Sequence, residues 1–212
     1  MTEPDFDDAF RAKLAQLFTW RRDVRHFRSD PIPVQTIARL TSEASHSPSV
    51  GYSQPWRFVN VVSEHRRSAV ISSFERANAD ALRGYDGADA TKYATLKLAG
   101  LREAPVHLAV FCDDATDRGK GLGRATMPET LAYSVVMSIY TFWLAARACG
   151  IGAGWVSILE PGVVTTALDV SGSWQLVAYL CVGYPLAQSD SPELERASWE
   201  KRDDRAATLY ER

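Results

Sequence analysis

The stretch that decides the fold is TLAYSVVMSIYTFWLAARACGIGAGWVSIL, residues 130–159. Its first part, 130–149, has a helical pattern that is apolar on nearly all sides, which is typical of a helix buried inside a domain or in an oligomer interface. Gly150 suits the end of that helix. The β-branched run WVSIL at 155–159 then predicts a strand. The chain length allows one α/β or α+β unit built around this pair.

The rest of the chain reads as one continuous domain, 1–212, without repeats or linkers. Three more strands are predicted, at 57–63, 106–112 and 176–183. Further helices are predicted at 5–20, from 34 to just before Pro48, and at 66–82, 92–102 and 161–168. In the second of these helices, Val34 belongs to the predicted apolar face. The polar, glycine-rich segment 113–129 is typical of a lid or of a disordered stretch.

Composition excludes several classes of function. Lys and Arg number 24 against 26 Asp and Glu, so no global positive field attracts nucleic acid. The first ten residues are acidic, where a secretory or transit peptide would be basic, and no apolar run approaches the roughly 20 residues that span a bilayer. We therefore expect a cytoplasmic protein with no membrane partner. The four histidines lack HxxxH and HExxH spacing, so we expect no metal site.

A basic cluster, Arg21-Arg22-Asp23-Val24-Arg25, directly follows the first predicted helix. Arg21 and Arg25 could hold a phosphate with bidentate hydrogen bonds. A solvated charge run with internal ion pairs explains the same pattern. Amid three arginines Asp23 should stay ionised, which suits hydrogen bonding to a polar ligand or accepting a proton in a closed site.

Two other segments are candidates for ligand binding. The loop SPSVGYSQPW at 47–56 is stiffened by two prolines, and Ser49 and Gln54 offer hydrogen-bonding groups; an ordinary turn fits it as well. The C-terminal run PELERASWEKRDDR is either a solvated helix or a segment whose Lys201 and Arg202 fold back onto a phosphate. Ser157 lacks a GxSxG elbow, and the glycines before it lack the GxGxxG order, which disfavours a hydrolase and a dinucleotide site.

Read in order, several segments resemble the nitroreductase-like flavoprotein family, over about residues 20–202. These segments are RRDVRHF, SPSVGYSQPWRFV, FERAN, YATLKLAGLREAPVHLAVFCD, GLGRATMPET, FWLAARACGIGAGWVSIL, YLCVGYP and PELER. The basic cluster and the SQPW loop are shared with nitroreductases in general. RRDVR with Asp23, the LKL…EAP run and GWVS with Ser157 resemble the branch that makes 5,6-dimethylbenzimidazole.

The resemblance implies an α+β, nitroreductase-like fold with a central mixed sheet flanked by helices. It also implies a homodimer that buries FMN at the subunit boundary. The reaction of this branch consumes reduced FMN and O2, and it yields 5,6-dimethylbenzimidazole, the lower ligand of cobalamin, together with erythrose 4-phosphate. The flavin is then a substrate. A separate flavin reductase would supply it, with NAD(P)H acting only indirectly through that reductase.

The resemblance also assigns residues. Catalysis falls to Asp23, which would move protons or orient the flavin, and to Ser157, which would hydrogen-bond near the ring edge where oxygen adds. The segment 113–129 would be a lid that excludes water from the site. Flavin contacts are assigned to Arg21, Arg22, Asp23, Arg25, Ser49, Gln54, Lys97, Ser157 and Arg202.

Two other functions stay open at this point. An FMN-dependent NAD(P)H nitroreductase or quinone reductase would keep its flavin through turnover, and a non-catalytic flavin-binding protein would only store it. Asp23 and Ser157 argue against storage, which needs neither. The chain departs from the family pattern at Ser53, Ala99 and Thr141, where a larger apolar residue, an acidic residue and an asparagine are more common. These departures bear on fine substrate contacts.

Overall fold

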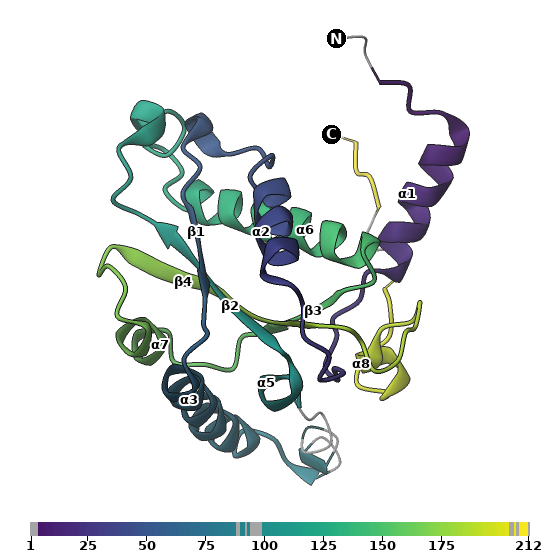
Figure 1. Ribbon diagram of the computed structural model, residues 1–212, viewed down its shortest axis with the longest axis vertical. Coiled ribbons are helices and arrows are strands. Elements are labelled where there is room, and N and C mark those ends of the chain that lie inside the picture. The colour runs from purple at the N-terminus through teal and green to yellow at the C-terminus, as the bar shows by residue number, and fades with distance from the viewer. Residues whose placement is uncertain are drawn as a thin grey trace.

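The protein is an α+β domain with helices on both faces of one sheet (Figure 1). The computed structural model describes residues 4–87, 90–91, 93, 99–203, 206 and 208–211. The strands, in spatial order, are β1 (Trp56–Asn60), β2 (Val106–Asp113), β4 (Trp174–Gly183) and β3 (Gly152–Val156). One face carries α2 (Val34–Ala44) and α6 (Thr130–Ala148), and the other carries α3 (Glu64–Leu82), α5 (Gly100–Glu103) and α7 (Pro161–Leu168). The remaining elements are α1 (Asp8–Trp20), α8 (Glu193–Arg196) and the 3-10 helices η1 (Val50–Tyr52) and η2 (Arg118–Gly121).

The predicted α+β class is confirmed, but the sheet is not mixed in the way the resemblance implied. All three pairings between the named strands are antiparallel. Among the described residues, parallel pairing is limited to an isolated bridge between Asp23 and Ala153. The chain around Asp23 follows β3 for only a few residues. By Phe27 it has moved to Pro185, with which it forms an isolated antiparallel bridge.

The two central strands account for the long apolar runs seen in the sequence. On β2, Leu108 and Val110 pack toward α2 and α6, while Ala109 and Phe111 pack toward α3 and α7. β4 alternates in the same way, with Tyr179 on the α3 side. Strands buried on both faces need apolar residues at every position, so no polar alternation marks them.

The helix α6 packs against α2, α1 and the sheet. By length and composition it could cross a membrane, which the sequence reading of apolar runs did not anticipate. Its inner residues, such as Val135, Ile139 and Phe142, belong to the core, so here it is a core helix. Its outer face is exposed and consists of Tyr133, Val136, Met137 and Tyr140. The neighbouring α1 has no buried residue and exposes Phe10, Phe18 and Trp20, and Phe6 is exposed just before it.

Two expectations about individual elements need correction. The strand predicted at 155–159 is Gly152–Val156, because the glycines lie in the strand where another segment passes close to it. Val34, expected on an apolar face, is 72% exposed at the first residue of α2. Of the helix predicted at 92–102, only the part in α5 can be compared, since residues 94–98 lie outside the described ones.

Replacing Gly154 should destabilise the protein strongly. A Cβ at this position would lie 2.1 Å from the carbonyl oxygen of Val24, and a backbone atom cannot rotate away. We expect Gly154→Ala to lower the free energy of unfolding by about 1–3 kcal/mol, as overpacking does. Urea unfolding measures this change.

The matched control is Gly162→Ala. Gly162 lies in α7, and a Cβ there would meet nothing within 4 Å. Alanine in a helix should be neutral or stabilise by about 0.5–1 kcal/mol. Equal stability of the two variants would show that Val24 does not pass β3 as closely as described.

Candidate active site

The segment 21–25 is held along the outer edge of β3. Arg21 ends α1, and its N–H donates to the Leu17 carbonyl over 2.9 Å. The Val24 N–H donates to the Ala153 carbonyl over 3.0 Å. Gly154 leaves room for this approach. The sheet therefore positions the backbone from which the charged side chains project.

The Asp23 carboxylate is fixed by the same strand. Its Oδ1 accepts a hydrogen bond of 2.8 Å from the Trp155 N–H, and its Oδ2 lies 3.4 Å from Arg25 Nε. Burial raises the pKa of Asp23, although the Trp155 N–H and Arg25 both act to lower it, and the nearby charge of Glu193 raises it further. The sequence reading considered only the neighbouring arginines, and in the structure burial outweighs them in setting the direction of the pKa shift. A carboxyl with a raised pKa is suited to exchanging a proton.

Four arginines meet around one cavity of about 200 Å³. The cavity is lined by Arg21, Arg22, Asp23, Arg25, Pro192, Glu193, Leu194 and Arg202. The residues that line the cavity carry four guanidinium groups and two carboxylates, so positive charge is in excess along its wall, although Asp190 and Glu195 also act on Arg22 from nearby. Burial, with the positive charges of Arg21 and Arg202, lowers the pKa of Arg22. Several positive charges around one cavity favour the binding of an anion, and guanidinium groups bind phosphate well. The residues present thus fit the phosphate of a flavin mononucleotide.

The four guanidinium groups are not equivalent. Arg22 donates to the Asp190 carbonyl from Nε over 2.9 Å and also from Nη2, and Nη1 donates to the Arg21 carbonyl over 2.9 Å. Arg22 therefore anchors the loop after β4, a role that the sequence did not indicate. Arg25 is paired with Asp23. Among the described residues, the side chains of Arg21 and Arg202 have no hydrogen bond or ion pair, so both are free to bind an anion.

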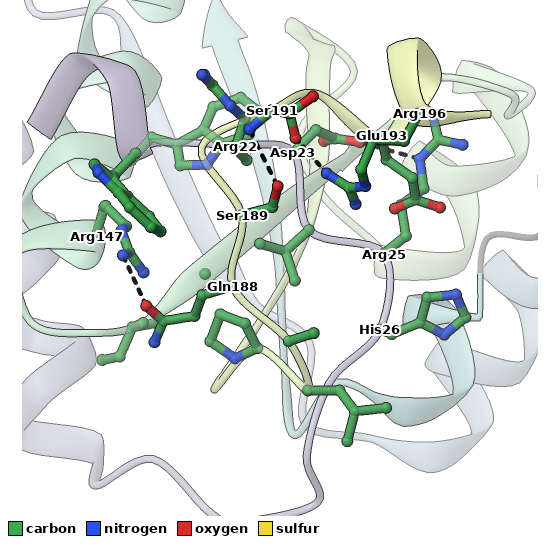
Figure 2. A pocket seen from close by; sticks show the side chains of 18 residues that line it. Arg22, Asp23, Arg25, His26, Arg147, Gln188, Ser189, Ser191, Glu193 and Arg196 are labelled. Atoms are coloured by element: carbon green, nitrogen blue, oxygen red, sulfur yellow. Dashed lines mark hydrogen bonds and ion pairs between the residues drawn. The ribbon is translucent and has the colours of Figure 1, made fainter. Parts of the chain in front are cut away.

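A second cavity, of about 320 Å³, lies against the same segment (Figure 2). Arg22, Asp23, Arg25 and Glu193 line both cavities. Most of the rest of its wall comes from the chain at 185–191 and from the C-terminal end of α6, which contributes Trp143 and Arg147, and Arg147 donates to Gln188 over 2.9 Å. The remaining lining residues are Trp20, Val24, His26, Ile151, Gly152 and Arg196. Figure 2 shows Asp23 and Arg25 side by side above this chain. Asp23 therefore lies between two cavities and contributes to the wall of each.

Ser157 directly follows the last residue of β3 and is exposed. It stands two residues beyond Trp155, whose N–H holds Asp23. Ser157 lines neither of the two cavities. The same strand therefore places both predicted catalytic residues, but the structure brings no described atom of Ser157 into hydrogen-bonding contact with Asp23.

Ser49 and Gln54 lie elsewhere. They flank η1, which sits with η2 at the upper left of Figure 1, whereas the arginine cavity lies near β3 and α8 at the lower right. Ser49 Oγ accepts from the Gln54 N–H over 3.0 Å, and Arg118 Nη2 donates to Gln54 Oε1 over 2.9 Å. The predicted lid, 113–129, carries Arg118 and so lies against this loop. Within one chain, these residues do not meet Asp23.

Some positions were missed or need comment. Glu193 lines both cavities, and the signals for it were the mixed charges of PELERASWEKRDDR and the place of PELER among the segments that carry the resemblance. Thr141, one of the departures, shares a hydrogen bond of 2.7 Å with Ser47, and Ser53 is buried with an unpartnered hydroxyl among the described residues. Ala99 precedes α5. Lys97 lies outside the described residues.

Comparison with known proteins gives consistent relatives. A protein of Rhodospirillum rubrum named 5,6-dimethylbenzimidazole synthase is 60% identical over 95% of this chain and 95% of its own length. A Rhodobacter capsulatus protein of the same name is 46% identical over 93% of this chain and 95% of its own length.

Solved structures share the fold at lower identity. Iodotyrosine deiodinase bound to FMN and 3-iodo-L-tyrosine superimposes with a TM-score of 0.70 at 23% identity, covering 83% of this chain and 91% of that one. A nitroreductase-like protein from Streptococcus mutans gives a TM-score of 0.71 at 17% identity, and the match covers 95% of this chain and 99% of that one. The model of the nitroreductase family matches residues 18–184. The chain therefore belongs to the nitroreductase family and, by its similarity to the two synthases, to the 5,6-dimethylbenzimidazole synthase group within it.

Proposed function

We propose that this protein fragments reduced FMN with O2 to give 5,6-dimethylbenzimidazole and erythrose 4-phosphate. The observation that carries the proposal is Asp23, a carboxyl with a raised pKa that β3 fixes at the wall of a cavity lined by four arginines. Such a site can bind the phosphate of a substrate and exchange a proton with the rest of it. The name of the relatives at 60% and 46% identity supports the same reaction.

Binding is assigned as follows. Arg21 and Arg202, whose side chains have no hydrogen bond or ion pair among the described residues, take the phosphate, and Arg25 remains with Asp23. Arg22 holds the loop after β4 in place. The reduced flavin supplies the reactivity toward O2 and is consumed as a substrate. We further propose that a separate flavin reductase delivers it, so that NAD(P)H acts only indirectly, and that the protein works in the cytoplasm.

Asp23 and Ser157 are proposed as the catalytic residues. Asp23 holds or moves a proton at Oδ2, which accepts a long contact of 3.4 Å from Arg25 Nε, whereas Oδ1 accepts a hydrogen bond of 2.8 Å from the Trp155 N–H. Ser157, exposed at the end of β3, offers a hydroxyl that can donate a hydrogen bond to the substrate.

We also propose a homodimer whose two chains complete each site. Ser49 and Gln54 lie away from the arginine cavity of their own chain (Figure 1). The exposed apolar faces of α1 and α6 offer a surface for a second copy, because contiguous apolar surface of this kind marks an interface. In such a dimer the loop at 47–56 and the segment 113–129 of one chain would cover Asp23 of the other.

The direct test mixes the purified protein with chemically reduced FMN, admits air and analyses the products by chromatography with mass detection. We expect 5,6-dimethylbenzimidazole to appear in step with the loss of flavin. Flavin that reoxidises intact would contradict the proposal, and steady NAD(P)H oxidation with retained flavin would assign a nitroreductase instead.

Asp23→Asn should bind flavin but make little product. The amide keeps an oxygen for the Trp155 N–H, and the change removes a negative charge from an anion site, so binding of reduced FMN should be retained or strengthened. Loss of a proton-transfer group should lower the rate of product formation about 100-fold or more. Single-turnover product formation measures the rate, and calorimetry under anaerobic conditions measures binding.

The matched control is Asp30→Asn. Asp30 pairs with an arginine two residues away, as Asp23 does, but it is exposed and lines neither cavity. Its variant should turn over like the unaltered protein. Normal product formation by Asp23→Asn would refute the catalytic role of Asp23.

Mixed dimers test the shared site. Asp23→Asn and Gln54→Leu should each impair turnover, yet a dimer of one chain of each kind contains one intact site. Random reassociation should therefore restore about a quarter of the unaltered activity. Mixing Asp23→Asn with Ser157→Gly is the control, since both residues lie on the same β3 edge and no intact site forms. Recovery in the control, or none in the test pair, would reject the shared site.

A further inference from the structure

We propose that Trp143 and Tyr140 of α6 are positioning residues that hold the Arg21 guanidinium ready for the phosphate of the flavin. The inference rests on the proposed function, because it takes the anion in the arginine cavity to be that phosphate. It adds a reason why the Arg21 guanidinium is held in place, with its N–H donors available, before the substrate arrives. It also assigns a role to two aromatic residues to which the resemblance gave none, Tyr140 and Trp143.

The geometry is a guanidinium over two rings. Arg21 Cζ lies 5.1 Å from the centroid of the Trp143 ring and 5.9 Å from that of Tyr140. Positions three residues apart lie on the same side of a helix, so both rings of α6 reach the same cation. Trp143 is only 8% exposed, and its ring is fixed by the packing of the core. Attraction between a cation and a ring face at this distance is favourable.

Arg21 has no competing partner. Among the described residues, no hydrogen bond or ion pair reaches its side chain, and its Nε is buried without an acceptor. This distinguishes Arg21 from Arg25, which faces the Asp23 carboxylate, and from Arg22, which donates to backbone carbonyls. A buried N–H donor without an acceptor lowers the stability of the fold unless a ligand or a water molecule accepts its hydrogen bond.

Stacking on rings and pairing with a carboxylate have different consequences for binding. A carboxylate would neutralise the guanidinium and occupy its N–H donors. A ring face restrains the plane of the group but leaves its charge and its donors available. Restraint before binding reduces the entropy lost on binding. Trp143 and Tyr140 should therefore strengthen recognition of the phosphate in particular, rather than recognition of the flavin ring.

The test compares two ligands that differ by the phosphate. Dissociation constants of chemically reduced FMN and chemically reduced riboflavin are measured by anaerobic calorimetry on the full chain. Trp143→Leu should weaken binding of FMN about tenfold, within the range of a desolvated cation–ring contact, and leave riboflavin unchanged. Trp143→Phe keeps a ring face. It also removes no hydrogen bond, since Trp143 Nε1 has no partner in the described part of the chain, so its affinities should stay near those of the unaltered protein.

Two further variants keep the test decisive. Tyr140 is 42% exposed in the single chain, so Tyr140→Leu should fold even if Trp143→Leu does not, and it should weaken FMN binding in the same selective way by a smaller factor. Because Tyr140 also belongs to the outer face of α6, gel filtration must show that this variant keeps the oligomeric state of the unaltered protein. Trp174→Leu is the matched control, because Trp174 also lies under an arginine, Arg57, at 5.9 Å, but lines neither cavity at the site. It should alter neither affinity.

The outcomes separate the two proposals. If the unaltered protein binds reduced FMN no better than reduced riboflavin, the phosphate cavity and the proposed function both fail. If it prefers FMN, but the leucine variants lose affinity for both flavins equally or for neither, only the positioning role of Trp143 and Tyr140 is overturned.

Discussion

The contact between the chain at 23–24 and the edge of β3 is the constraint on which the site depends. Two hydrogen bonds make it, from the Val24 N–H to Ala153 and from the Trp155 N–H to Asp23. These residues are about 130 positions apart in sequence, so Asp23 acquires its environment only when the sheet has formed. The absence of a side chain at Gly154 permits the approach. The same strand ends at Ser157, which means that one edge of the sheet sets the places of both proposed catalytic residues.

Charge in the site is organised by what each guanidinium contacts. Arg22 uses its donors on backbone carbonyls, Arg25 faces Asp23, and Arg21 lies on aromatic rings. The three therefore experience different surroundings although they are neighbours in sequence. Mutual repulsion within such a cluster is a cost of folding, and an anion that enters the cavity relieves it. The repulsion that opposes folding is thus the same interaction that favours phosphate, and a bound anion should stabilise the fold by mass action.

The periodicity of apolar residues predicted the bounds of those helices and strands whose residues simply pack into the core. α7 and β2 begin where the pattern placed them, and α6 ends one residue before the predicted position. The pattern failed where contacts between segments far apart in the sequence determine the local structure. Gly152 lies in β3 against its low strand propensity, because Val24 and Pro185 approach it closely. The basic cluster was identified as a site from composition and resemblance, but the attachment of Arg22 to Asp190 was not, since nothing local in the sequence marks a partner 168 residues away. The raised pKa of Asp23 was missed for the same reason: burial is a property of the fold, whereas neighbouring arginines are visible in the sequence.

The two parts of the candidate site lie at opposite corners of one rigid sheet, and this arrangement has a consequence for the proposed dimer. Ser49 and Gln54 are tied to η1 and Arg118, and Asp23 is tied to β3, so neither part can move to the other without breaking the fold. If both parts belong to one site, as proposed, a second chain has to bring them together. The faces of α1 and α6 that would bury against that chain are the ones that expose aromatic and aliphatic side chains. Packing at this interface would then set the distance between Asp23 of one chain and the 47–56 loop of the other. A change that weakens the dimer would therefore also change the geometry of the site. A substitution on the outer face of α6, far from any flavin contact, would act on catalysis through that distance.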